Sequence, residues 1–88
     1  MPETLPRSAA RFTAPLRDRA ADVRARKARI RPAVTWGQIA ARTPSGYAES
    51  TVRVAANLAT MYPEPVLAEI ETALDQIEAE REAEREAA

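Results

Sequence analysis

Two residue types that carry much of protein chemistry are missing from this 88-residue chain, which has no cysteine and no histidine. Without cysteine the chain can form no disulfide and offers no thiol nucleophile. Without histidine it lacks the commonest acid–base residue and the commonest zinc ligand. Its two glycines are too few for a glycine-rich phosphate loop. We therefore expect no enzyme activity, no catalytic residue, no metal site and no cofactor.

Long apolar runs are also missing. No segment approaches the roughly 20 apolar residues of a membrane span, and the N-terminus lacks the apolar stretch of a signal peptide. We therefore expect a cytoplasmic protein with no membrane partner. Half of the residues that make the chain 45% hydrophobic are alanines, so the core must be small. Because a chain this short buries only roughly 60% of its unfolded surface, a second copy would help to stabilise it.

Alanine, arginine and glutamate dominate the sequence, and alternating β-branched runs are absent, which predicts an all-α fold. The net charge is zero, but the charges are sorted along the chain. Residues 1–31 carry a net charge of +6, residues 32–62 carry +1 and residues 63–88 carry −7. This pattern has two interpretations. Either a basic surface binds a polyanion while the acidic part lies away from it, or two oppositely charged helix faces attract each other.

Four helices are predicted. The first runs from Thr13, its N-cap, to about Ile30, and Pro32 prevents it from continuing. Its buried stripe is expected to consist of Leu16, Ala20, Val23 and Ile30. Residues 1–12, which precede it, are interpreted as a flexible basic arm.

A short second helix is marked by a capping box, in which Thr35 is the N-cap and Gln38 reaches back from the third helical position. This helix is expected over residues 36–42. Residues 43–46 then have the chemistry of a type I turn. A third helix is expected from about residue 47 or 48 to Tyr62.

The fourth helix is long, starts near Pro65 and has apolar residues at the spacing of a coiled-coil seam. It is predicted to form a dimer interface, which places the domain at residues 13–77 and a charged, fraying helix end at residues 78–88. The expected dimerisation residues are Val66, Leu67, Ile70, Leu74 and Ile77.

Ile39-Ala40, a turn, and Ser50-Thr51-Val52-Arg53 follow one another within residues 34–59. This order resembles helix-turn-helix DNA-binding proteins of the small bacterial and phage type, although the turn is about two residues longer than the tight version. The resemblance, which defines no narrower family, implies a four-helix helix-turn-helix domain that binds double-stranded DNA sequence-specifically. It further implies a homodimeric transcriptional regulator, a repressor encoded by a phage or plasmid.

A recognition helix in the major groove must expose side chains that reach base edges. Glu49, Arg53 and Asn57 share one face of the third helix, and these residue types can pair with cytosine, guanine and adenine respectively. We expect these three residues to contact bases. The expected contacts to the DNA backbone are Arg24, Arg26, Lys27, Arg29, Arg31, Thr35, Gln38, Ser45, Tyr47, Ser50 and Thr51.

Structural explanations remain open for the same residues. Glu49 and Arg53 could form an ion pair within the helix, Asn57 could be solvated, and the arginines could be attracted to the acidic C-terminal part. Two other functions also remain open. One is a protein-binding adaptor, inhibitor or antitoxin that uses the acidic helix, and the other is an RNA binder that uses residues 17–31. No small-molecule substrate is evident.

Overall fold

The computed structural model describes residues 12–87, and within this range the chain forms α-helices and no strand. The helices are α2 (Ala14–Arg29), α3 (Trp36–Ala40), α4 (Glu49–Ala56) and α5 (Glu64–Ala87). The predictions of an all-α fold and a long C-terminal helix are confirmed. The predicted basic arm lies outside the described residues, apart from Phe12.

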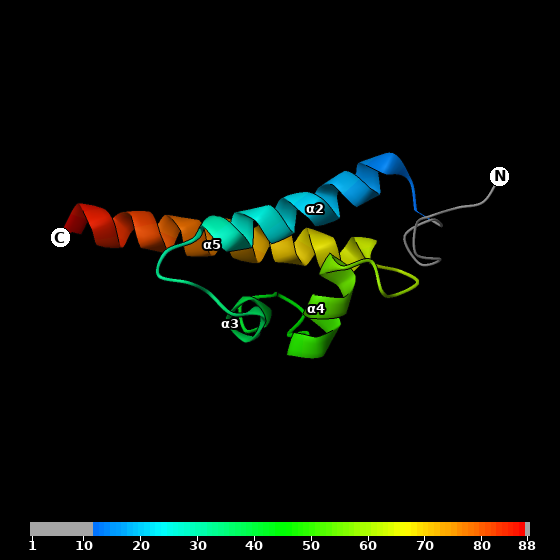
Figure 1. The fold of residues 1–88 in the computed structure, drawn as a ribbon. Helices are drawn as coiled ribbons and strands as arrows, with labels where there is room; N and C mark the ends of the chain where they lie inside the picture. The colour runs from blue at the N-terminus through cyan, green and yellow to red at the C-terminus, as the bar shows by residue number, and fades with distance from the viewer. Residues whose placement is uncertain (1–11, 88) are drawn as a thin grey trace.

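The two long helices, α2 and α5, lie side by side and run in the same direction (Figure 1). Their ion pairs show the alignment, because Arg19 contacts Glu71 and Arg26 contacts Glu78. In each pair the arginine and the glutamate are 52 residues apart in the sequence. This constant separation shows that the two helices stay aligned over roughly two turns. The basic first part of the chain and the acidic last part therefore meet within the fold.

Helix α2 starts and stops where the sequence predicts. The hydroxyl oxygen of Thr13 accepts a hydrogen bond from the backbone N–H of Leu16 at 3.4 Å, so Thr13 is the N-cap. Ile30 has an extended backbone and ends the helix, and the peptide bond between Arg31 and Pro32 is cis. This segment leads the chain away from α2 towards α3.

Helices α3 and α4 pack against each other on one side of the α2–α5 pair (Figure 1). The predicted capping box is present: Gln38 N–H donates to Thr35 Oγ1 at 3.0 Å, and Thr35 N–H donates to Gln38 Oε1 at 2.8 Å. The predicted turn is present as well, because the N–H of Gly46 donates to the carbonyl of Thr43 at 3.0 Å. Gly46 has a φ of +71°, a conformation that glycine adopts without steric cost.

Helix α4 ends at Ala56, which is earlier than predicted. The reason is Leu58, which adopts a left-handed conformation with a φ of +55°. The N–H of Ala59 then donates to the carbonyl of Val54 at 2.7 Å, which closes the helix with a Schellman motif. Glycine usually occupies this left-handed position, so a leucine there gives no local signal. The side chain of Leu58 is buried, which stabilises the conformation.

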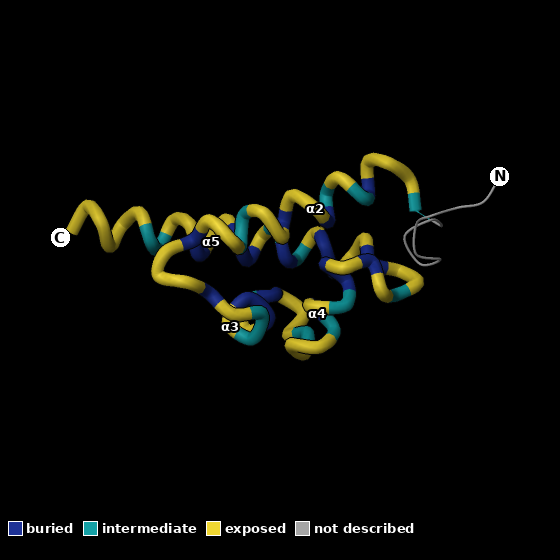
Figure 2. The backbone as a smooth tube through the Cα atoms, viewed as in Figure 1, coloured by how far each residue is buried: buried dark blue, intermediate teal, exposed yellow. Residues whose placement is uncertain are grey.

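The core lies where α2 and α5 meet each other and where α3 and α4 meet this pair (Figure 2). All five predicted dimerisation residues of α5 belong to it, with no more than 6% of any of them exposed: Val66, Leu67, Ile70, Leu74 and Ile77. The stripe that was predicted to form a seam between two copies packs onto α2, α3 and α4 of the same chain. None of the helices within residues 12–87 is long and apolar enough to cross a membrane.

Candidate nucleic-acid interface

Helix α4 separates its buried and exposed side chains as a reading helix requires. Val52, Ala55 and Ala56 are fully buried, so small side chains let α4 lie close to the rest of the core. Two of the predicted base contacts, Glu49 and Arg53, are exposed on α4. The third, Asn57, is exposed as well but lies just beyond the end of the helix and not on its face.

Asn57 has a structural role at that position. Its amide nitrogen donates a hydrogen bond to the carbonyl of Arg53 at 2.9 Å. This bond provides a donor for one of the carbonyl groups in the last turn of α4. A bidentate contact to adenine would need both the oxygen and the nitrogen of the amide. This hydrogen bond would therefore have to break before Asn57 could read adenine in the predicted way.

Glu49 leans towards the start of α3. A methyl group on Gly37 would lie 3.5 Å from Glu49 Oε1, which shows how near the carboxylate is to that helix. Within residues 12–87, Glu49 and Arg53 form no ion pair with each other. The alternative in which they neutralise each other is therefore not what the structure shows.

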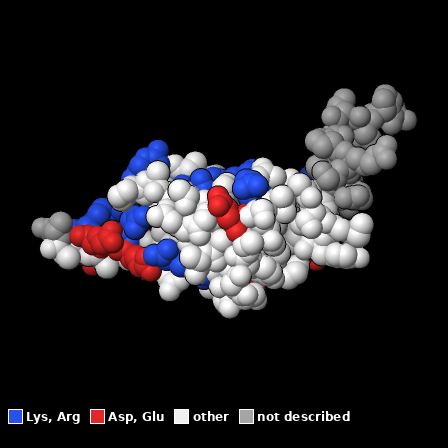
Figure 3. Space-filling view, turned by 90° about the horizontal axis from the view of Figure 1, so that it is seen from below, with Lys and Arg blue, Asp and Glu red and all other residues white. Residues whose placement is uncertain are grey.

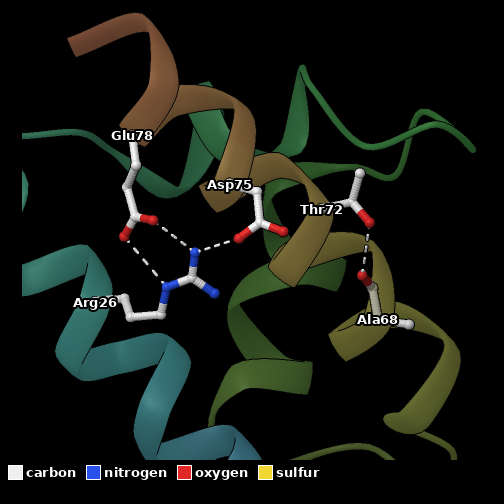
Figure 4. Close-up of polar contacts among 5 residues, drawn as sticks. All are labelled: Arg26, Ala68, Thr72, Asp75 and Glu78. Carbon is white, nitrogen blue, oxygen red and sulfur yellow. Dashed lines mark hydrogen bonds and ion pairs between the residues drawn. The ribbon is translucent and has the colours of Figure 1, made fainter. Parts of the chain in front are cut away.

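One side of α2 is paired with α5. Arg26 Nη2 lies 2.6 Å from Asp75 Oδ1 and 2.7 Å from Glu78 Oε1, and the arginine side chain is only 16% exposed (Figure 4). Arg19 pairs with Glu71 at 2.8 Å in the same way. Arg26, a predicted DNA backbone contact, is therefore held by carboxylates of its own chain. For this residue, attraction between two helix faces explains the charge sorting.

Another side of α2 faces α3 and α4. Arg24 Nη1 donates to the carbonyl of Ala56 at 2.5 Å, at the C-terminal end of α4 where the helix dipole favours a cation. The ammonium nitrogen of Lys27 lies 4.9 Å from the centre of the Trp36 ring, a cation–π contact. Neither cation has a carboxylate partner among residues 12–87, so both remain candidates for phosphate contact.

The last two predicted α2 contacts lie at the C-terminal end of the helix. Arg31 Nη1 donates to the carbonyls of Ala28 and Ile30 at 2.7 and 2.8 Å. Arg29 is exposed and has no ion-pair partner within the described residues. Both line a hollow against α5, so they are separated along α2 from the residues that contact α4.

Ser45 is engaged by an acidic residue. Its N–H donates to Glu69 Oε1 at 2.7 Å, and its hydroxyl donates to Glu69 Oε2 at 2.5 Å. A carboxylate at this point would repel a phosphate, so the prediction that Ser45 contacts the DNA backbone is not supported. Sequence reasoning missed Glu69 because it is 24 residues away.

Thr43 is a second residue that sequence reasoning missed. It is the polar residue buried in the core, and its hydroxyl donates to the carbonyl of Ala40 at 2.7 Å. The same oxygen accepts the N–H of Tyr47 at 3.0 Å. Thr43 thus ties the end of α3 to the segment before α4, and Tyr47 packs against the core.

The other predicted backbone contacts lie at two helix starts. Thr35 and Gln38 are exposed, but their side chains bond to each other's backbone in the capping box. Ser50 is exposed and Thr51 half-buried in the first turn of α4, whose N-cap residue, Ala48, provides no side-chain hydrogen bond. The backbone N–H groups at the start of α4 therefore have no side-chain cap, and the carboxylate of Glu49 lies in the same turn.

The ion pairs favour the charged form of each partner. Hydrogen bonding to Glu71 raises the pKa of Arg19, and hydrogen bonding to Glu78 raises the pKa of Arg26. Arg42 Nη2 lies 2.7 Å from Glu80 Oε1, and this hydrogen bond lowers the pKa of the Glu80 carboxyl. Carboxylates of α5 therefore neutralise cations of α2 and also the arginine that follows α3.

The surface formed by α3 and α4 carries little charge. Figure 3 views the molecule from this side and shows mostly uncharged side chains over it. The charged residues of segment 34–57 are Arg42, Glu49 and Arg53, and Arg42 is paired with Glu80. Arg53 is thus the main cationic group that α4 itself presents.

Comparison with known proteins does not extend this description, because no family model, no curated protein and no solved structure matches the chain. Among residues 12–87, no cluster of acidic, cysteine or histidine residues is placed to hold a metal ion. The resemblance to helix-turn-helix proteins therefore depends on the sequence of residues 34–59 alone.

Proposed function

We propose that this chain binds double-stranded DNA, with the exposed face of α4 in the major groove and α3 packed behind it as in a helix-turn-helix. Binding of this kind would serve transcriptional regulation. The observation that carries the proposal is the state of Arg53. It is exposed on α4, and its side chain has no hydrogen-bond or ion-pair partner among residues 12–87.

The contrast with three other arginines gives this observation its weight. Arg19, Arg26 and Arg42 each bond to a carboxylate of α5. The guanidinium donors of Arg53 have no partner among residues 12–87, so they are available to an acceptor outside the chain. A bidentate contact from arginine to guanine contributes about 1–3 kcal/mol of discrimination against the wrong base.

The buried face and the two ends of α4 support a role of its exposed face in DNA binding. Val52, Ala55 and Ala56 are buried, and the Schellman motif defines the end of the helix, so the exposed face is held in a definite position. Ser50 lies in a first turn whose backbone N–H groups donate to no side-chain cap. Such a turn can bind a DNA phosphate through its N–H groups and hydroxyl.

The cations that flank α4 set the strength of non-specific binding. Arg24 contacts the C-terminal end of α4, and Lys27 contacts α3 through Trp36. Each phosphate neutralised adds about 0.9 to the slope of log affinity against log salt. With Arg26 held by α5, we expect a shallow slope of about 2–3, corresponding to two or three phosphates.

We propose binding by a single chain, because the five residues predicted to form a dimer seam are buried inside the monomer. Size-exclusion chromatography with light scattering should therefore show one chain per particle. A stable dimer in solution would return the two-fold operator to consideration and would contradict this part of the proposal.

The test is a titration at two salt concentrations with two kinds of fluorescent duplex. One kind has random sequence, and the other has been enriched from random sequence by selection for binding to this protein. Arg53→Ala should lower affinity for the enriched duplex by about tenfold or more while changing affinity for random duplex much less. Arg19→Ala is the matched control, because it removes the same charge from the side paired with α5. Lys27→Ala should weaken binding to all sequences alike and reduce the salt slope by about one.

Titration of a labelled RNA under the same conditions distinguishes the other two functions. Stronger binding to RNA than to duplex would assign the reading helix to α2. No binding to either nucleic acid at low salt would eliminate the proposal and leave the protein-binding adaptor. Equal losses in Arg53→Ala and Arg19→Ala would show that only net charge matters, which would also refute reading by α4.

A further inference from the structure

Helix α5 extends beyond the C-terminal end of α2 (Figure 1). A hollow of about 180 Å³ lies where the end of α2 meets this part of α5. Its walls come from the end of α2, the residues that follow it, and the last turns of α5. Five arginines line it: Arg26, Arg29, Arg31, Arg81 and Arg85. The acidic residues of the lining are Glu78 and Glu82, which leaves an excess of three positive charges.

Only part of this charge is neutralised within the chain. Arg26 is paired with Asp75 and Glu78, as described above. Arg29 and Arg85 have no ion-pair partner among residues 12–87. Like charges that line one hollow repel one another, and an anion in the hollow would reduce this repulsion.

Arg81 is the second observation, and it is independent of the net charge. It follows Ile77 at the next position of the α5 stripe, where an apolar residue would continue the core. Its side chain is only 19% exposed, its sole ion-pair contact is a long one of 3.8 Å to Glu84, and its Nε is buried without an acceptor among the described residues. A buried guanidinium N–H without an acceptor costs stability unless a bound group supplies the oxygen.

We propose that this hollow binds a phosphate group, either as inorganic phosphate or as the terminal phosphate of a nucleotide. A phosphate has several oxygens at fixed angles, which suits the planar guanidinium donors of the arginines that line the hollow. The apolar side chain of Ile30, which also lines the hollow, limits hydration on one side. The site contains no residue proposed above to read DNA bases, so it is separate from the DNA-binding proposal.

The experiment is an NMR titration of the ¹⁵N-labelled full chain with inorganic phosphate, with a nucleoside monophosphate, and with chloride at matched ionic strength. We expect a saturable shift of the Arg81 Nε–H resonance with a Kd of about 1 mM or tighter for at least one phosphate compound. Chloride should produce no saturable shift. The phosphate compound that saturates at the lower concentration identifies the source of the phosphate group.

Variants at exposed positions test the site without disturbing the core. Arg29→Gln and Arg85→Gln should each weaken phosphate binding by about tenfold, the effect of losing one charged hydrogen-bond donor. Arg53→Gln, which removes the same charge from α4, should bind phosphate like the unmodified chain. The proposal is overturned if no phosphate compound saturates the shift, if chloride acts equally, or if Arg53→Gln weakens binding as much as the site variants do. Because Arg53 belongs only to the DNA proposal, failure of one proposal is distinguishable from failure of the other.

Discussion

The α2–α5 pair and the α3–α4 pair are built by different means. The α2–α5 pair consists of long helices that share an apolar stripe and are linked by ion pairs from Arg19 and Arg26. The α3–α4 pair consists of short helices whose ends are defined by local hydrogen bonds: the capping box of Thr35 and the Schellman motif at Leu58. In the first pair Arg19 and Arg26 are bonded to carboxylates of the neighbouring helix, whereas in the second Arg53 is exposed and has no partner among residues 12–87.

This difference shows that the part of the chain with the highest positive charge is not the candidate DNA-binding surface. A net charge of +6 near the N-terminus suggests a basic surface for a polyanion. In the fold, two of the cations in this part of the chain, Arg19 and Arg26, are paired with carboxylates of α5. The candidate DNA-binding surface is instead the less charged region, where polar side chains and a few cations are held by short, well-capped helices.

The largest expected effect comes from the α2–α5 core. Leu74→Ala removes a fully buried side chain of α5 and should lower the free energy of unfolding by about 2–5 kcal/mol, measured by urea denaturation followed by circular dichroism. Met61→Ala is the control, because that side chain is 61% exposed and should change stability by less than about 0.5 kcal/mol. Similar losses in both variants would contradict the assignment of Leu74 to the core.

The two glycines of the α3–α4 region should respond with opposite signs. Gly46→Ala forces a side chain into a left-handed conformation and should destabilise the fold by about 1–2 kcal/mol. Gly37→Ala adds a helix-favouring residue to α3, where its nearest contact would be an ordinary 3.5 Å, and should stabilise the fold by about 0.5–1 kcal/mol. Urea midpoints of both variants provide the measurement. If both substitutions changed the stability in the same direction, the local backbone conformation would not be what determines their effects.

The caps provide a smaller comparison between the two regions. Thr35→Ala removes one side of the capping box and should cost about 1 kcal/mol. Thr13→Ala should cost less, because its hydrogen bond to Leu16 is long, at 3.4 Å, and the long helix has many other contacts. Thermal unfolding of both variants tests this order, and a greater loss in Thr13→Ala would reverse the comparison.

The smallest expected effect is the pH dependence of the link between Arg42 and Glu80. Because the pKa of Glu80 lies below its ordinary value of 4.5 in the folded chain, the pair stabilises the fold above that pH. The stabilisation is lost as the pH falls through the lowered pKa, since the folded chain must then take up a proton that it binds less tightly than the unfolded chain does. The urea midpoints of Glu80→Gln and of the unmodified chain should therefore differ at pH 7 and converge at strongly acidic pH. A difference that persists in acid would assign the effect to something other than this charge.

Local sequence signals predicted the helix starts well. Thr13 and Thr35 cap the helices that they were expected to cap, and Gly46 lies in the expected turn. The end of α4 could not be predicted, because Leu58 adopts a conformation that its type disfavours and that burial in the core stabilises. At the candidate site the exposure of Arg53 was anticipated, whereas the engagement of Ser45 by Glu69 was not.

The sequence by itself determined the helical class, most of the helix boundaries and the apolar stripe of α5, because these depend on residues within a few turns of each other. Only the tertiary structure decided what that stripe covers and which arginines remain unpaired. Arg26 and Glu78 are 52 residues apart, and only the parallel packing of α2 and α5 brings them together. Periodicity identifies an apolar face but not its partner, since burial is favourable against any complementary surface. The stripe predicted to join two copies therefore joins the helices of one.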